Sequence, residues 1–196
     1  MAIIVDKEKK RRDIAIACTD LLLEKGLNKL TISEIAKTAG IGKGSVYDYF
    51  ANKEAVVFEI IRNLIQEHHE GLNTYTNEHT SCREKTLYLF DFYLCQVNDY
   101  SQHLEVYKEY IAATLSNGNL SMSEFNKECT DFIQQILKLI IQDGIAKGEL
   151  KPVAEHLISG MLATERGFLV MGWTDHRQYK QEFTQFINTL FDLIER

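Results

Sequence analysis

Apolar residues recur along most of this chain at the three- and four-residue spacing of amphipathic helices. The first apolar stripe comprises Ile14, Ala17, Cys18, Leu21 and Leu22. Gly26 follows at a position suited to the end of that helix. Further stripes predict helices near 32–38, 43–49, 53–73, 83–99, 103–116, 121–147, 153–172 and 178–196. The last of these carries Phe183, Phe186, Ile187, Leu190 and Ile194. The pattern therefore predicts an all-α fold.

Polar residues and glycines mark the ends of the short elements between residues 31 and 53. Thr31 and Glu34 have the spacing of a capping box, in which each side chain bonds the backbone N–H of the other. Gly40 supplies a turn before the second short helix, and Asn52 offers a cap for the next one. Two short helices joined in this way predict a helix-turn-helix. We therefore expect a first domain over 1–53 and a second over 54–196.

The composition excludes several classes of protein. The 196 residues include one proline and 11 glycines, and 45% are hydrophobic against 26% charged. This composition excludes a disordered or collagen-like chain. The chain also has too few glycines and prolines for the many turns of an all-β fold. The apolar stretch 153–173 contains Glu155, Glu165 and Arg166, which a membrane span does not tolerate. The scattered cysteines predict no disulfide framework, and we expect a cytoplasmic protein that does not contact a membrane.

Charge is distributed unevenly along the chain. Residues 1–53 hold ten Lys/Arg against seven Asp/Glu, whereas residues 54–196 hold twelve against twenty-one. A basic segment on an acidic protein indicates a local anion-binding module. An excess of three charges is also compatible with chance, so the charge distribution alone does not establish such a module. The residues of the helix-turn-helix must be considered as well.

The second short helix has an outer face suited to nucleic acid. Lys43 and free N–H groups at its start attract anions, and Gly44 allows close approach of a ligand. Tyr47 and Tyr49 add aromatic hydroxyls, and Lys53 adds a cation at the next helix start. These groups suit phosphates and groove edges. The alternative is a solvated helix face with tyrosines in the core.

The segments TISEIAKTAG (31–40), IGKGSVYDYF (41–50) and NKE (52–54) resemble the DNA-binding signature of the TetR family of transcriptional regulators. The resemblance covers about residues 10–60, and residues 144–150 are weakly similar to a turn of the family's regulatory domain. It implies an all-helical homodimer with an N-terminal three-helix DNA-binding domain. It also implies that a larger helical domain binds an effector and forms the dimer.

The resemblance further implies which residues contact DNA. Thr31, Tyr49 and Lys53 match phosphate-contacting positions. The positions nearest the bases are Lys43, Gly44, Ser45 and Tyr47. Gly42 departs from the serine that family members often have, so one phosphate-contacting hydroxyl is in doubt.

Two features of this domain leave alternatives open. Asp48 either accepts a hydrogen bond from a cytosine amine or faces solvent, and phosphate repulsion favours solvent. The run 9–12 places four cations where they oppose the helix macrodipole. Either an external polyanion relieves that cost, or the run is a solvated basic end.

In residues 54–196, small side chains line one side of a helix at Ser159, Gly160, Ala163, Thr164 and Gly167. Small residues let helices approach closely, so this stripe and the final apolar stripe predict a four-helix interface between two subunits. Packing within one chain is the alternative. For a mostly apolar effector the candidate lining is Tyr88, Phe92, Tyr107, Tyr110, Phe132, Glu165 and Trp173. Glu165 and Arg166 would orient a polar ligand group, or form a solvated or interfacial ion pair.

The sequence thus predicts a ligand-responsive regulator that binds a pseudo-palindromic operator in double-stranded DNA. We expect a repressor that an unknown small effector releases. The alternative is a DNA-bound adaptor of the same fold that recruits a protein and has no small effector. No glycine-rich nucleotide loop, nucleophile elbow or metal motif occurs, so we expect no enzyme activity, no cofactor and no metal.

Overall fold

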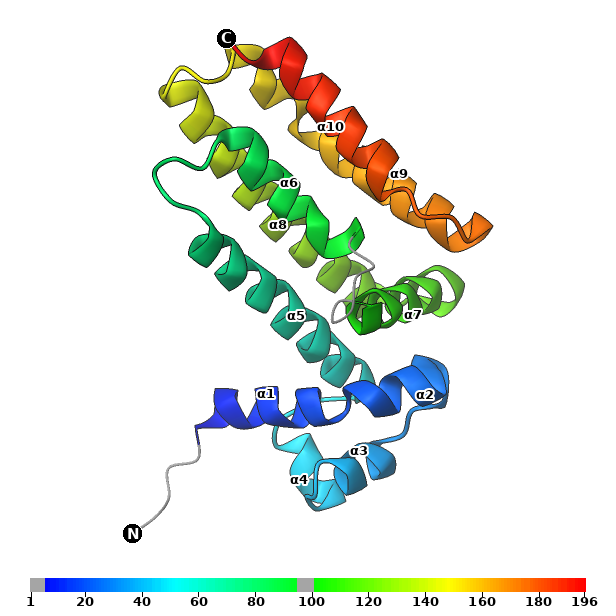
Figure 1. The fold of residues 1–196 in the computed structure, drawn as a ribbon. Helices are drawn as coiled ribbons and strands as arrows, with labels where there is room; N and C mark the ends of the chain where they lie inside the picture. Colours follow the sequence, from blue (N-terminus) through cyan, green and yellow to red (C-terminus); the bar gives the residue numbers. More distant parts are fainter. Residues whose placement is uncertain (1–5, 95–100) are drawn as a thin grey trace. The chain divides into compact units, whose positions relative to one another are not determined.

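The structure, a computed structural model, describes residues 6–94 and 101–196. These residues form ten α-helices, one 3-10 helix and one antiparallel bridge between Leu150 and Glu195. The elements are α1 (Lys7–Ala17), α2 (Thr19–Lys29), α3 (Ile32–Thr38), α4 (Lys43–Tyr47), α5 (Lys53–Tyr75), α6 (Cys82–Leu94), α7 (Ser101–Asn117), α8 (Leu120–Ala146), η1 (Pro152–Leu157), α9 (Ile158–Asp175) and α10 (Lys180–Ile194) (Figure 1). The all-α prediction is confirmed.

The helices gather into two compact units. The first unit contains Met1–Gln66 and Ser101–Asn126, and the second contains Glu67–Tyr100 and Lys127–Arg196. The chain passes from one unit to the other inside α5 and again inside α8. These units follow contacts rather than function, so the division at residue 53 stays a prediction. Among the described helices, none is both long and apolar enough to cross a bilayer.

The first helix of the chain is shorter than the apolar stripe indicates. A single helix was predicted from Ile14 to Gly26, but α1 ends at Ala17, and Cys18 has φ −93° and ψ 0°. The Cys18 N–H bonds the carbonyl of Ala15 at 3.0 Å, which is a tightened i→i−3 turn. The apolar stripe continues through this turn, so periodicity alone does not reveal it.

The end of α2 is held by two side chains of opposite charge. Gly26 has φ 74° and ψ 156°, which ends the regular helix as predicted. The next N–H, of Leu27, donates to Glu109 Oε1 of α7 at 3.0 Å. The Leu27 and Asn28 carbonyls each accept from Lys53 Nζ at 2.9 Å. The segment that leads into α3 is therefore fixed from both α5 and α7.

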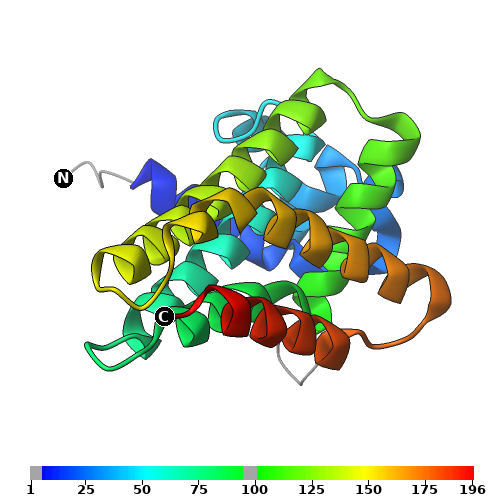
Figure 2. The same cartoon turned by 90° about the horizontal axis from the view of Figure 1, so that it is seen from above.

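In the second unit, α6, α9 and α10 pack against one another, and α9 and α10 run side by side in Figure 2. Phe90 of α6 meets Phe183 of α10 edge to face, with ring centroids 5.2 Å apart. Arg83 of α6 donates to Glu195 at 2.9 Å and to Asp192 at 2.6 Å. Aromatic packing and these ion pairs anchor the C-terminal helix.

One helix boundary and one apolar stripe differ from the expectation. Residues 152–157 form the 3-10 helix η1, with Pro152 at its first position, rather than the start of an α-helix at 153. In α10, Phe186 is 36% exposed and Leu190 is half-buried, so the predicted stripe only partly faces the core. Part of the helix predicted over 83–99 lies outside the described residues.

We predict that Gly26→Ala lowers the free energy of unfolding by about 1–3 kcal/mol, because only glycine adopts this backbone conformation at low cost. A Cβ there would also lie 2.5 Å from Glu109 Oε1. Urea denaturation measures the change. Gly44→Ala is the matched control, since its Cβ would meet nothing within 4 Å and alanine favours the helix. An unchanged midpoint for Gly26→Ala would contradict the left-handed conformation at Gly26.

Candidate functional site

The helix-turn-helix predicted from the sequence is present in the first unit. Thr31 and Glu34 form the capping box at the start of α3, with both reciprocal hydrogen bonds made. The turn after α3 contains Gly40 at φ 66°, and the Ile41 N–H bonds the Ala36 carbonyl at 3.0 Å. α3 and α4 lie side by side (Figure 1). Local sequence signals therefore fix the path of the chain into α4.

α4 is held in place by its inner face and by the residues that follow it. It has only five residues, too few to be stable alone. Val46 and Phe50 are 0% and 1% exposed and anchor it in the core. The Arg11 guanidinium of α1 lies 5.0 Å from the centre of the Phe50 ring and donates to the Tyr49 carbonyl at 2.9 Å. Arg11 also donates to the buried Glu59 of α5 at 2.9 Å.

In the sequence, Arg11 is distinguished only as part of a basic run, which does not reveal this role. Its partners are 38 and 48 residues away in the chain, at Tyr49 and Glu59. No signal at that spacing distinguishes Arg11 from the neighbouring Arg12, which is exposed.

The anchoring leaves a polar face of α4 in solvent. Lys43, Gly44, Ser45 and Asp48 are exposed, and Tyr47 is 55% exposed. Tyr49 is half-buried beside Arg11. The residues predicted to lie nearest the bases thus share one accessible surface.

Two of the predicted phosphate contacts are engaged within the protein. The Thr31 hydroxyl donates to Glu34 Oε2 at 2.7 Å and accepts from the Glu34 N–H at 3.3 Å. Lys25 pairs with Glu34 and, with Thr31, holds the pKa of that carboxyl below its usual value. Lys53 uses two of its three donors on carbonyls. The third N–H of Lys53 has no acceptor among the described residues.

The predicted ligand residues are divided between the two units. Tyr107 and Tyr110 are buried in the first, where the Tyr110 hydroxyl donates to the Met122 carbonyl at 2.6 Å. The second contains Tyr88, Phe132, Glu165 and Trp173. The side chain of Phe92 lies outside the described residues.

Tyr88 belongs to an aromatic stack in the second unit. Its ring stacks on His68 at 5.0 Å and on Tyr75 at 4.7 Å between centroids. His68 Nε2 lies 3.0 Å from the Tyr88 carbonyl, and burial lowers the pKa of His68, which keeps it neutral. Phe132 meets His69 edge to face at 5.6 Å. Tyr88 and Phe132 therefore each pack against neighbouring rings of the same unit.

Glu165 is an acid inside the second unit. Its side chain is 1% exposed, and Oε2 accepts from Arg166 Nε at 3.1 Å. Oε1 has no hydrogen-bond partner among the described residues. Desolvation raises the pKa of the Glu165 carboxyl to about 7, although Arg166 opposes the shift. The unit thus contains a polar atom whose burial is not compensated.

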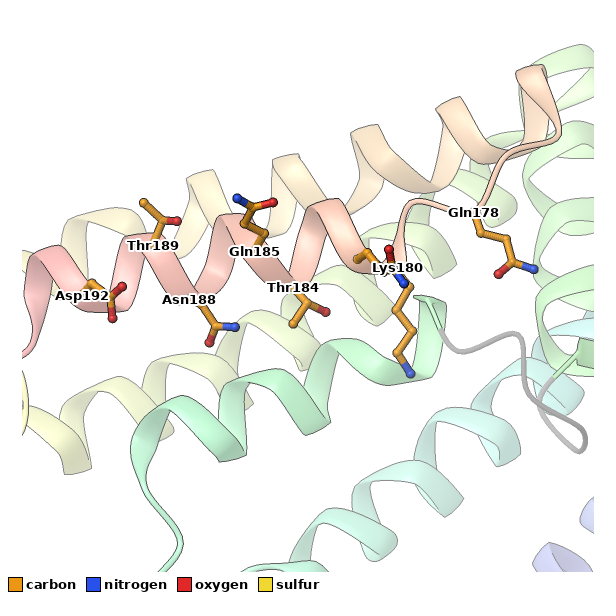
Figure 3. Close-up of a pocket in the computed structure, with 8 residues that line it drawn as sticks. Gln178, Lys180, Thr184, Gln185, Asn188, Thr189 and Asp192 are labelled. Carbon is orange, nitrogen blue, oxygen red and sulfur yellow. The ribbon is translucent and has the colours of Figure 1, made fainter.

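A groove of about 690 Å³ runs along α10 and contains none of the predicted ligand residues (Figure 3). Its lining is Gln178, Lys180, Gln181, Thr184, Gln185, Asn188, Thr189 and Asp192. Lys180 at one end pairs with Asp91 at 2.5 Å, and Asp192 at the other pairs with Arg83. The polar lining does not match an apolar effector.

Comparison with known proteins gives matches in sequence and fold. Residues 17–60 match the family described as bacterial regulatory proteins, tetR family. The fatty acid metabolism regulator protein of Bacillus subtilis (strain 168) is 26% identical over 146 residues, 74% of this chain and 73% of that protein. The HTH-type transcriptional repressor KstR2 of Rhodococcus jostii (strain RHA1) is 23% identical over 145 residues, 74% of this chain and 71% of that protein.

Two solved structures show the same fold along almost the whole chain. A transcriptional regulator from Saccharomonospora viridis in complex with choline has a TM-score of 0.73 at 17% identity, covering 96% of this chain and 98% of that one. FadR from Bacillus subtilis in complex with stearoyl-CoA has a TM-score of 0.59 at 22% identity, covering 92% and 95%.

We predict that Glu165→Gln stabilises the protein more at pH 8 than at pH 5. Because the folded pKa is about 7 against an ordinary 4.5, the folded state binds this proton more tightly. The stability that this proton contributes is complete below pH 4.5 and is lost as pH rises through 7. Each pKa unit corresponds to about 1.4 kcal/mol.

Thermal unfolding of both proteins at the two pH values measures the difference. The exposed Glu182→Gln is the control and should show equal shifts at pH 5 and pH 8. Equal shifts for Glu165→Gln as well would contradict the raised pKa of Glu165.

Proposed function

The chain is a helix-turn-helix transcriptional regulator of the TetR family and not an enzyme, and we propose that it is a repressor released from its operator by a small, mostly apolar effector. Residues 1–53 are the DNA-binding domain, and residues 54–196 bind the effector and form a homodimer. The observation that carries the proposal is the exposed polar face of α4, which Phe50 and Arg11 hold in a fixed orientation.

The outer face of α4 fits the DNA-binding role. Lys43 and Ser45 are exposed donors, and Gly44 allows close approach. Tyr47 is a large side chain that is exposed although aromatic, which fits a contact with base edges or methyl groups. Thr31, Tyr49 and Lys53 flank this face as phosphate contacts. The relative KstR2 is named a transcriptional repressor, which supports repression rather than activation.

The effector is proposed to bind among the helices of residues 54–196. The second unit supplies aromatic side chains at Tyr88, Phe132 and Trp173, and Glu165 Oε1 is free to accept from a donor on the ligand. A fatty acid metabolism regulator among the relatives and a stearoyl-CoA complex among the solved structures support a ligand with a long apolar part. The choline complex shows that another protein of this fold binds a small cation.

A homodimer through α9 and α10 is supported by what these helices expose. A Cβ added at Gly160 or Gly167 would meet nothing within 4 Å. Val170 and Met171 are 48% and 45% exposed, and Leu193 of α10 is 67% exposed. Small and apolar side chains in solvent on adjacent helices are the composition of a subunit interface. A dimer also presents two recognition helices to two half-sites.

The alternative is an adaptor of the same fold that binds DNA and a protein but no small molecule. The aromatic stack around Tyr88 favours it, since rings that contact one another leave less room for a ligand. A ligand that stabilises the protein and weakens DNA binding separates the two functions.

We predict that Lys43→Ala and Tyr47→Ala each weaken operator binding about tenfold or more without lowering the melting temperature, because both side chains are exposed. A duplex selected in vitro from random sequences with the wild-type protein serves as operator in a gel-shift titration. Lys127→Ala, an exposed cation of α8, is the control. Unchanged affinity for both variants would rule out α4 as the recognition helix.

We predict that Gly160→Leu and Gly167→Leu convert the dimer into monomers. The fold should persist, because the added side chains meet no atom of the same chain within 4 Å at Cβ. Light scattering at micromolar concentration gives the mass, and circular dichroism reports helix content. Ala112→Leu, exposed on α7, should remain dimeric. A monomeric wild-type protein would refute the interface.

We predict that stearoyl-CoA raises the melting temperature and weakens operator binding, whereas choline does less. The ligand must favour a spacing of the two recognition helices other than the roughly 34–36 Å of one DNA turn. The factor by which the operator lowers the affinity for the ligand should equal the factor by which the ligand lowers the affinity for the operator. Calorimetry with and without operator measures the first of these factors. Equal ligand affinity of the free and the operator-bound protein would contradict release by this ligand. If neither compound binds, the adaptor function is favoured.

A further inference from the structure

We propose that Lys7 and Lys10 on the first turns of α1 form a second DNA-phosphate site beside the recognition helix. The proposal rests on the DNA-binding role of α4 and adds a contact outside the residues 17–60 that match the family. It also assigns a function to Lys10 of the basic run 9–12.

The position of the site follows from Arg11. The Arg11 guanidinium donates to the Tyr49 carbonyl and to Glu59, each at 2.9 Å. The middle of α1 is therefore fixed against the residues that follow α4. Ile14 and Cys18 continue the same face of the helix into the core. Lys7 precedes Arg11 by four residues and belongs to this face, and Lys10 lies at its edge. Lys7 thus lies on the side of α1 whose Arg11 bonds the carbonyl of Tyr49, which is itself a proposed phosphate contact.

The charges at this end of α1 are not balanced within the protein. Within the described residues, neither Lys7 nor Lys10 has an ion-pair or side-chain hydrogen-bond partner. Asp6 bonds the N–H groups of Glu8 and Lys9 at 3.1 and 3.2 Å, which caps the helix. Cations that follow such a cap oppose the macrodipole, whereas an external anion satisfies both them and the helix end.

Other cations of the same unit show the contrast. Lys25 pairs with Glu34, Lys53 bonds two carbonyls, and Arg11 pairs with Glu59. These three cations thus have partners within the fold. Within the part of the chain that the structure describes, Lys7 and Lys10 lack such partners, as does Lys43 of α4; the exposed Lys9, Arg12, Lys29 and Lys37 lack them too, so the helix face, rather than the missing partner alone, distinguishes Lys7 and Lys10.

The two faces of α1 supply a matched control. At 3.6 residues per turn, Lys9 and Arg12 lie on the face opposite to Lys7, Arg11 and Ile14. Both are exposed. Removing Lys9 and Arg12 takes away the same two charges from the same helix turns. A contact with DNA should therefore depend on which pair is removed, whereas a general effect of charge should not.

The experiment compares Lys7→Gln/Lys10→Gln with Lys9→Gln/Arg12→Gln, using the full chain and a duplex selected in vitro with the wild-type protein. Dissociation constants are measured from 50 to 200 mM salt. Each phosphate contact contributes about 0.9 to the slope of log affinity against log salt. We expect the slope of the first variant to fall by about 2 per subunit and that of the second to change by less than half as much.

Two further measurements keep the result interpretable. Lys7→Arg/Lys10→Arg should restore the wild-type slope, because the charge is kept. The ratio of affinities for operator and unrelated duplex should be unchanged in Lys7→Gln/Lys10→Gln, since phosphates carry no sequence information, whereas Lys43→Ala should reduce it.

Equal slopes for the two double variants, or no loss in either, would overturn the phosphate site. A wild-type protein that binds no duplex would overturn the proposed function itself, and this is visible before any variant is made. A lower melting temperature with an unchanged slope would show that Lys7 and Lys10 stabilise α1 only, which also overturns the site.

Discussion

A five-residue helix cannot maintain its own conformation in water, and the rest of the first unit depends on how this constraint is met. Burial of Val46 and Phe50 fixes one side of α4, and Arg11 fixes the end of the segment through the Tyr49 carbonyl. The outer side can then be polar without loss of order. A rigid, exposed polar face is what a surface that reads DNA requires, because order acquired on binding would lower affinity.

The segment before α3 meets a similar constraint by a different means. The chain leaves α2 at Gly26 in a conformation that exposes backbone groups, and charged side chains of α7 and α5 satisfy them. Glu109 accepts on one side of Leu27 and Lys53 donates on the other. The entry to the helix-turn-helix is thus held by side chains from helices outside it, and Lys53 contributes both to this joint and to the proposed phosphate contact.

Local signals in the sequence are sufficient to predict the helix-turn-helix. Thr31, Glu34, Gly40 and Asn52 act within a few residues of themselves, so their roles can be deduced from spacing alone, and the structure confirms the capping box and the turn. The role of Arg11 could not be deduced, because its carboxylate partner is 48 residues away. The burial of Glu165 was equally hidden, since an acid in an apolar helix is as compatible with a solvated ion pair. The DNA and ligand residues stay predictions.

The buried carboxylate of Glu59 and its partners tie α4 to helices far from it in the chain. Glu59 accepts from Arg11 at 2.9 Å and from Arg62 at 3.3 Å, and a buried carboxylate needs such partners because desolvation is costly. Arg62 in turn lies 5.3 Å from the centre of the Phe125 ring at the start of α8, and Phe58 stacks on that ring at 4.4 Å. If α8 shifts, Arg62 and Phe58 must repack. Because α5 and α8 both continue into the second unit, the side chains that orient α4 are carried by helices whose other ends pack elsewhere in the chain.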